Sequence, residues 1–368
     1  MINNSLRILF FGSDKFSLYS LQKLYNLHQG NRNLIESLQI VSRPPKWGGK
    51  KRSILRTPKI LEDISSFSTL PPAVLCDNRN ELLNKLLPLI EKQQFNMLIC
   101  VSFGLLIPQQ LIEKVPHTLN LHPSLLPRYM GSSPIQKALL NNDKYTGITI
   151  QSLHPTKFDK GEIIAQSEEL EISELLQENN HVNEIPIYSS RLTDSLGQRG
   201  SDLLGDVLEN HSYLKPSNQF QLRKYQASLA PRIQTTDKLV QWRQENATQI
   251  HRRLMTLGPL YTFIKCGYNE KTGDEIIKRV IIHSFSVIAN QPTQQPVMEP
   301  GSFQFTGANN EQMKVFCHKG TAINVISIQM GGSKIAAPSQ FFTTWQKQFP
   351  HRNKNSPQAP CQFLFHSE

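Results

Sequence analysis

Three polar side chains follow the ends of two predicted strands and together have the chemistry of an acyl-transfer site. Asn120 and His122 stand two positions apart in the short apolar run "HTLNLHP", so both point to the same side of a strand. Asp159 comes 37 residues after His122, in a turn that follows the next predicted strand. Ligands of parallel sheets bind outside the carboxyl ends of the strands, so we expect these three side chains to share one site.

An amide, an imidazole and a carboxylate suit acyl transfer between two amines. That reaction passes through a tetrahedral intermediate with a negatively charged oxygen, to which Asn120 and a protonated His122 could donate hydrogen bonds. Asp159 could hold His122 charged and oriented, and could take protons from the attacking amine directly or through water. Taken singly, each residue is also what a turn or a strand cap uses, and His117 and His154 remain alternative histidines near the same strand ends.

Strands that alternate with helices are predicted along the N-terminal part of the chain. Near-continuous apolar runs predict buried strands at residues 6–11, 38–41, 95–104, 117–123, 147–155 and 162–170. Helical spacing or helix-start signals mark residues 14–27, 81–93, 108–115, 134–142 and 192–208, with Ser13 or Asp14 as the first cap. This alternation predicts an α/β, Rossmann-like domain with a mostly parallel sheet.

The pattern changes after Tyr225, where short β-type runs separated by glycine and asparagine predict a small, OB-like antiparallel β-barrel. We expect helices at residues 248–257 and 338–349, the latter capped by Ser339. The predicted organisation is an N-terminal domain at 1–210, a linker at 211–224, the barrel at 225–350 and a loose tail at 351–368. The polar residues 171–191 are expected to be an insertion or loose loop.

Charge and cysteine usage narrow the class of partner. The chain of 368 residues has 40 Lys and Arg against 29 Asp and Glu, a net charge of +11. This excess favours a polyanionic partner, nucleic acid first and an anionic membrane surface second, although a basic protein of a basic compartment has the same balance. Five scattered cysteines argue against a disulfide framework and a zinc site, and no apolar run reaches the ~18 residues of a membrane span.

The segment "HPSLLPRYMGSSPIQKALLNNDKYTGITIQ", with "FDKGEII" after it, resembles the signature of the folate-dependent formyltransferases. The resemblance implies that Asn120, His122 and Asp159 are catalytic and that 10-formyltetrahydrofolate is a consumed formyl donor, with no metal. It also implies that the folate is held by one loop and by the wall of a pteridine pocket. The loop residues are Ser124, Leu125, Leu126 and Pro127; the wall residues are Val101, Ser102, Phe103 and Gly104.

A basic segment, "SRPPKWGGKKRSILRTPK", follows the second predicted strand. Such a loop can follow a phosphate backbone and stack an aromatic ring on a base. Its position resembles the insertion that enters tRNA in the members of this family that formylate initiator Met-tRNA, although a solvated basic loop or a localisation patch would look alike. The predicted tRNA-binding residues are Arg43, Lys46, Trp47, Lys50, Lys51, Arg52 and Arg56.

The start of the barrel, "YQASLAPRIQTTDKLVQW", resembles the opening of the tRNA-binding domain of those members, and the resemblance extends over residues 6–346. It implies an enzyme that formylates initiator Met-tRNA and works in the mitochondrial matrix. We also expect a monomer and no membrane association. Only six residues precede the first apolar run, so we expect no long transit peptide. Two rival functions are a folate-dependent transferase for a small amino-sugar or nucleotide acceptor, and a non-catalytic tRNA-binding module.

Overall fold

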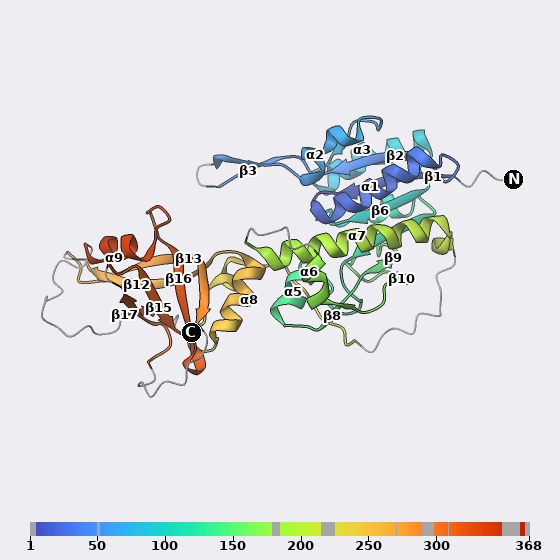
Figure 1. The fold of residues 1–368 in the computed structure, drawn as a ribbon. Helices are drawn as coiled ribbons and strands as arrows, with labels where there is room; N and C mark the ends of the chain where they lie inside the picture. Colours follow the sequence, from blue (N-terminus) through green and yellow to red (C-terminus); the bar gives the residue numbers. More distant parts are fainter. Residues whose placement is uncertain are drawn as a thin grey trace, which may run out of the picture. The chain divides into compact units, whose positions relative to one another are not determined.

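The chain folds into two compact units. The structure, a computed structural model, describes residues 5–49, 52–178, 185–214, 225–269, 271–288, 298–307, 309–347 and 361–364. The first unit comprises residues 1–182 and 190–232, and the second comprises 183–189 and 233–368. Figure 1 gives the order of their elements along the chain.

A seven-stranded sheet forms the centre of the first unit, in the order β10-β9-β7-β6-β1-β2-β5. The five strands from β7 to β5 are parallel, β9 is antiparallel to β7, and β10 is antiparallel to β9. The prediction of a mostly parallel, Rossmann-like sheet is therefore confirmed. The strands are β1 (Leu6–Gly12), β2 (Ile35–Ser42), β5 (Val74–Leu75), β6 (Met97–Val101), β7 (His117–His122), β9 (Thr149–Gln151) and β10 (Ile163–Gln166).

Helices cover this sheet because the central strands are apolar on both faces. Leu9 and Phe11 of β1 pack with Leu82 and Leu86 of α3, and α1 contacts β1, β2 and β6. Asp14 caps α1 by accepting a hydrogen bond from the Ser17 amide at 3.0 Å. The helices are α1 (Lys15–Gly30), α2 (Lys59–Glu62), α3 (Arg79–Gln93), α4 (Gln109–Ile112), α5 (Pro134–Leu140), α6 (Ile172–Glu178) and α7 (Ile187–Glu209).

The expectation of a loose loop at residues 171–191 is wrong for most of that stretch. Residues 172–178 form α6, and α7 already begins at Ile187. Ile172 and Leu175 lie one helical turn apart and are both buried. This short apolar stripe stabilises the helix, although the polar residues around it suggested a loop. A short pair, β8 (Tyr145–Thr146) with β11 (Leu170–Glu171), leads into this helix.

The basic segment after β2 is a β-hairpin. Strands β3 (Lys46–Gly48) and β4 (Ile54–Arg56) pair antiparallel, with Trp47 opposite Leu55. Figure 1 shows this hairpin extending away from the sheet of its own unit. The exposed fractions of Trp47 and Leu55 are 62% and 47%, so a cross-strand apolar pair faces solvent. Lys50 and Lys51 lie outside the described residues.

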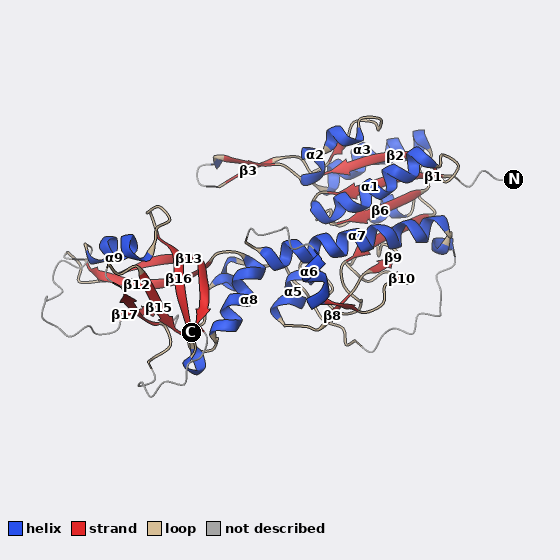
Figure 2. Ribbon diagram, viewed as in Figure 1, coloured by secondary structure: helices blue, strands red, loops and turns tan. Residues whose placement is uncertain are grey.

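A closed antiparallel barrel forms the second unit, in the order β12-β13-β16-β15-β14-β17, which confirms the predicted barrel. Figure 2 shows the strands of this unit in red. Helix α8 (Ala247–Leu257) packs on β12 and β13, and α9 (Pro338–Gln346) on β15 and β16. The strands are β12 (Leu260–Tyr268), β13 (Glu275–Ile288), β14 (Ser302–Thr306), β15 (Gln312–Phe316), β16 (Ala322–Met330) and β17 (Cys361–Leu364).

The domain limits differ from those predicted. Residues 361–364, expected in a loose tail, form β17 and close the barrel between β12 and β14. The reason is Phe363, which is fully buried and stacks on Trp242 with ring centroids 5.5 Å apart. Residues 225–232, expected in the barrel, belong to the first unit because Ser228 and Ala230 exchange backbone hydrogen bonds with Met130. Helix α9 is preceded by Ala337 and starts with Pro338, so Ser339 is not its cap.

No helix among the described residues is long and apolar enough to cross a membrane.

Candidate active site

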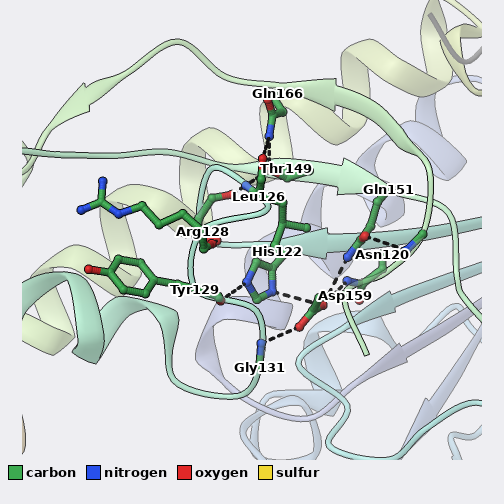
Figure 3. A network of polar contacts seen from close by, with 12 residues as sticks. Asn120, His122, Leu126, Arg128, Tyr129, Gly131, Thr149, Gln151, Asp159 and Gln166 are labelled. Atoms are coloured by element: carbon green, nitrogen blue, oxygen red, sulfur yellow. Dashed lines mark hydrogen bonds and ion pairs between the residues drawn. The ribbon is translucent and has the colours of Figure 1, made fainter. Parts of the chain in front are cut away.

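The ends of β7 and β9 and the turn before β10 bring the three predicted catalytic side chains together (Figure 3). Asn120 Nδ2 donates to Asp159 Oδ1 at 3.2 Å, and His122 Nδ1 lies 3.4 Å from the same oxygen. β9 is antiparallel to β7, with Gln151 opposite Asn120, so the carboxyl ends of these two strands point to opposite edges of the sheet. The turn after Gln151 brings Asp159 back beside Asn120 and His122, so the three side chains meet, although not through the parallel-strand geometry on which the expectation rested.

The Asp159 carboxylate is buried and is held by four donors. Besides Asn120 and His122, Gln151 Nε2 donates to Oδ1 at 3.2 Å, and the Gly131 amide donates to Oδ2 at 2.7 Å. The side chain of Asp159 is only 8% exposed. A buried charge costs several kcal/mol of desolvation unless hydrogen bonds replace its water, and these donors supply them to both oxygens.

His122 is a buried brace for this carboxylate. Its Nε2 donates to the Tyr129 carbonyl at 2.9 Å, since a carbonyl can only accept. The other nitrogen faces a carboxylate, so a doubly protonated ring satisfies both contacts. Asn120 lines the adjacent pocket and His122 does not, although both were expected on the same side of the strand.

Contacts of the Tyr129 side chain help to hold the backbone carbonyl of this residue in place. The backbone of Tyr129 is left-handed, with φ of 62°. Its hydroxyl donates to Asp143 at 2.5 Å and accepts from Asn141 at 2.7 Å. Burial and the bond to the Asp143 carboxylate raise the pKa of Tyr129, so the hydroxyl stays a neutral donor. Arg128 forms an ion pair with the same Asp143 carboxylate.

Glycines of the signature segment are explained by close packing. A Cβ on Gly161 would lie 1.7 Å from the Ser152 carbonyl oxygen, and a Cβ on Gly147 would lie 2.6 Å from the Leu125 side chain. Gly131 has φ of +122°, and a Cβ there would lie 2.6 Å from the Ala230 carbonyl oxygen. The turn of Asp159 and the loop that carries the Gly131 donor can therefore form only without these side chains.

A pocket lies beside Asn120 and Asp159. Its apolar wall comes from the segment after β6, and its other side from the segment after β9; the lining residues are Cys100, Leu105, Leu106, Ile107, Asn120, Gln151, Ser152, Leu153, His154, Lys157, Phe158 and Asp159. One end is polar and the remainder mainly apolar, which suits a flat heteroaromatic ring with a reactive group at the polar end.

The predicted folate residues are placed differently from that pocket. Val101 and Phe103 are buried in the core, and Ser102 and Gly104 are exposed with φ of 48° and 81°. This tight turn delivers the next three residues, 105–107, to the pocket wall. Leu105 to Ile107 continue the "FGLLIP" run, but only the structure shows which part of the run bends into the pocket.

The predicted loop of Ser124, Leu125, Leu126 and Pro127 packs beside the site and is absent from the pocket lining. Ser124 Oγ donates to the Arg128 carbonyl at 2.6 Å, and its own carbonyl accepts from Thr149 Oγ1 at 2.7 Å. Figure 3 shows Leu126 tied to Thr149 and Gln166. The loop thus joins β7 to β9 and shapes the Tyr129 and Gly131 contacts.

The alternative histidines and the buried thiol have different surroundings. His117 starts β7, at the other end of the strand from Asn120, and burial lowers its pKa. His154 lines the pocket, where its Nδ1 accepts from the Thr156 and Lys157 amides at 3.2 Å. Burial raises the pKa of Cys100 to about 12, so this thiol is protonated and is no nucleophile.

Sequence reasoning missed Gln151, which contacts Asp159 directly and is 1% exposed. It stands in "GITIQSLHP" as one polar residue in an apolar strand, and a buried polar residue at a strand end is the signal that could have found it. In the described part of the chain, no group of three or more His, Cys, Asp and Glu side chains is placed to hold a metal ion.

Two of the predicted tRNA-binding residues are engaged in ion pairs within their own unit. Arg43 and Lys46 approach Asp77 Oδ1 to 2.5 and 2.7 Å, and these contacts lower the pKa of Asp77. The sequence segment itself contains no acidic residue, so this partner was not foreseen. Trp47, Arg52 and Arg56 are exposed on the hairpin.

Comparisons with known proteins show the family to which the chain belongs. The model of the family described as "Formyl transferase" matches residues 6–184, and that of "Formyl transferase, C-terminal domain" matches 232–345. A Saccharomyces cerevisiae protein named "Methionyl-tRNA formyltransferase, mitochondrial" is 38% identical over 366 residues, which cover 93% of this chain and 90% of that protein. The chain belongs to the formyl transferase family. The predicted family is thereby confirmed.

More distant relatives extend the same pattern. A human protein named "Methionyl-tRNA formyltransferase, mitochondrial" is 26% identical over 97% of this chain and 82% of its own length. The crystal structure of HypX from Aquifex aeolicus in complex with tetrahydrofolic acid has a TM-score of 0.51 at 13% identity. It covers 94% of this chain, which spans 48% of HypX, and it shows a shared fold.

Replacing Gly161 by alanine tests the packing of the turn that carries Asp159. The added Cβ would collide with the Ser152 backbone, so we expect Gly161→Ala to lose about 1–3 kcal/mol of unfolding free energy and to lower formyl transfer more than tenfold (~1.4 kcal/mol). Urea unfolding and an activity assay measure the two effects.

Gly30→Ala is the matched control, because nothing lies within 4 Å of a Cβ at the end of α1. It should leave both quantities near those of the wild type. Wild-type stability and transfer in Gly161→Ala would show that the turn tolerates a side chain and that its shape does not fix Asp159.

Proposed function

We propose that this chain transfers the formyl group of 10-formyltetrahydrofolate to the α-amine of initiator methionyl-tRNA, giving formylmethionyl-tRNA for translation initiation. The observation that carries the proposal is the convergence of Asn120, His122 and Asp159 beside a pocket with an apolar wall, which Asn120 and Asp159 line. The similarity to proteins named methionyl-tRNA formyltransferase over more than nine-tenths of the chain supports the choice of acceptor.

The donor side of the reaction fits the arrangement of hydrogen-bond donors. Asn120 Nδ2 and His122 Nδ1 converge on one anionic oxygen, Oδ1 of Asp159. When the amine attacks the formyl carbon, the carbonyl electrons move to its oxygen, and this oxyanion suits the same two donors. The adduct collapses as N10 of the folate leaves with a proton and the formyl group stays on the amine.

Asp159 is the proton acceptor in this scheme. The attacking α-amine must lose a proton as its bond to the formyl carbon forms, and the carboxylate lines the pocket where that nitrogen would arrive. In the resting site His122 lies against Asp159 and is held from its other side by the Tyr129 carbonyl. A preorganised acid–base pair of this kind contributes about 10²–10⁴-fold to a rate.

The folate donor would occupy the pocket beside Asp159. Leu105, Leu106 and Ile107 offer an apolar face for a pteridine ring, and Phe158 is 58% exposed at the opposite side, where a ring could stack. HypX, whose fold is similar, is described in complex with tetrahydrofolic acid. We propose 10-formyltetrahydrofolate as the specific donor because N10 carries the group that this chemistry transfers, and we propose no metal in the reaction.

The β3–β4 hairpin is the proposed contact with the tRNA. Arg52 and Arg56 can neutralise phosphates, and Trp47 can stack on an exposed base. The ion pairs with Asp77 anchor Arg43 and Lys46 at the base of the hairpin, so we assign these two residues to its positioning. Lys50 and Lys51 remain proposed contacts, and the barrel is the proposed second tRNA-binding region.

The names of the yeast and human relatives support a mitochondrial location. We propose the matrix as the compartment, a monomer as the active form, and no membrane association. Formylation of initiator tRNA requires the enzyme and its substrate to share a compartment, so the location and the acceptor are one proposal.

The acceptor is tested by offering the purified chain three substrates with 10-formyltetrahydrofolate. We expect transfer to charged initiator Met-tRNA, and none to deacylated tRNA, which lacks the α-amine, or to a nucleotide-linked amino sugar. Formylation of the sugar without formylation of Met-tRNA would replace this proposal with that of a small-acceptor enzyme. Binding of both tRNA forms without any transfer would instead indicate an RNA-binding module.

The hairpin is tested by the double substitution Arg52→Ala/Arg56→Ala. Loss of two phosphate contacts should weaken tRNA binding and reduce the slope of log affinity against log salt by about 1 for each contact. Arg199→Ala is the control, because Arg199 is on α7 and pairs with Glu178. An unchanged affinity and salt slope in the double variant would exclude the hairpin from the tRNA interface.

A further inference from the structure

Gln151 is the last residue of β9, and both ends of its side-chain amide are bound to the same turn. Its Nε2 donates to Asp159 Oδ1 at 3.2 Å, and its Oε1 accepts from the Gly161 amide at 3.1 Å. The residue is 1% exposed and pairs with Asn120 across the β7–β9 ladder. One buried amide thus links the catalytic carboxylate to the backbone two residues beyond it. Figure 3 shows the contact between Gln151 and Asp159.

The hydrogen-bond network fixes which way this amide points. The Gly161 backbone nitrogen can only donate, so it must face Oε1. The Nε2 donor therefore faces Asp159, and the carboxylate can only accept when it is ionised. A glutamine satisfies both partners, whereas an apolar residue of the same length would satisfy neither.

The hydrogen bond between Gln151 and Asp159 should matter more during the reaction than in the resting site. We propose that Gln151 is a positioning residue that keeps Asp159 in place while Asn120 and His122 serve the oxyanion. This inference rests on the proposed function, in which two of the four donors to the carboxylate turn to the reacting oxygen. Gln151 Nε2 and the Gly131 amide then remain, one on each carboxylate oxygen.

A purely structural role at position 151 would not require a side-chain amide. Gln151 lies in a buried part of the sheet, between β7 and β10, where an aliphatic side chain would fill the same space without burying an amide. Both of its hydrogen bonds instead go to residues 159 and 161. Misplacement of a reacting group by about 1 Å can cost 10²-fold in rate, so a restraint on one carboxylate can matter greatly.

The test compares Gln151→Met and Gln151→Glu with the wild type in steady-state formyl transfer. Methionine keeps the length and removes both hydrogen bonds, and glutamate keeps the shape but loses the donor when ionised. We expect each variant to lower kcat at least tenfold at pH 8, while KM for Met-tRNA and for the folate changes less than threefold. Gln39→Met is the control: Gln39 is also a buried strand amide, and it donates to two carbonyls on β2 and before β5.

The pH profile separates positioning from packing. The titratable groups around position 151 are Asp159 and, from neighbouring segments, His122, Cys100, His154 and Lys157. All of them are present in the wild type and in both variants, so the titratable group that differs between Gln151→Glu and the wild type is the carboxyl group at position 151 itself. As the pH falls, the carboxyl group introduced by Gln151→Glu takes up a proton and becomes a donor, so this ratio should rise. It should stay flat for Gln151→Met.

Crystal structures of Gln151→Met and wild type complete the test without needing activity. We expect the Asp159 carboxylate to leave its position in the variant while the strands stay unchanged. An unmoved carboxylate, a wild-type kcat in Gln151→Met, or a pH ratio that is flat for both variants would overturn the inference. Absence of transfer to Met-tRNA by the wild type would reject the proposed function instead, and the crystal structures would still decide the role of Gln151.

Discussion

The buried carboxylate of Asp159 is the group on which the site depends. Its charge needs hydrogen bonds in place of water, and the donors come from β7, from β9 and from the Gly131 loop. These donors therefore fix three different segments relative to the same two oxygens. The antiparallel pairing of β7 with β9 places Gln151 beside Asn120, the turn after β9 brings in Asp159, and the hydrogen bonds to its carboxylate set the final alignment.

The loop between β7 and α5 is also linked to Asp159 indirectly, through His122. His122 spans the gap between Asp159 and the Tyr129 carbonyl, and the Tyr129 hydroxyl is anchored by Asp143 and Asn141. Glycines at the two crowded turns allow the backbone to pass where a side chain would collide. A change in this loop thus reaches the Asp159 carboxylate through defined contacts, although the loop does not line the pocket.

Much of this arrangement could be predicted because it follows from local patterns. Apolar runs marked the strands, the Asn120 and His122 spacing marked one face of a strand end, and the turn at Asp159 followed from its position after the next strand. What could not be predicted depends on tertiary packing. Asp77 is far from the basic hairpin in sequence yet neutralises part of it, and Phe363 turns an expected tail into a barrel strand by filling the space beside Trp242. Gln151 was missed for the same reason, since its partners are set by a turn rather than by periodicity.

The most direct test of this account is the single-turnover rate of formyl transfer in Asp159→Asn with saturating Met-tRNA and folate. An asparagine fits the same space but neither accepts the amine proton nor supports a charged His122, so the rate should fall by about 10²–10⁴-fold while both substrates still bind. Asp202→Asn, in an exposed ion pair on α7, should transfer at the wild-type rate. Transfer by Asp159→Asn within a few-fold of the wild type would contradict the central role of this carboxylate.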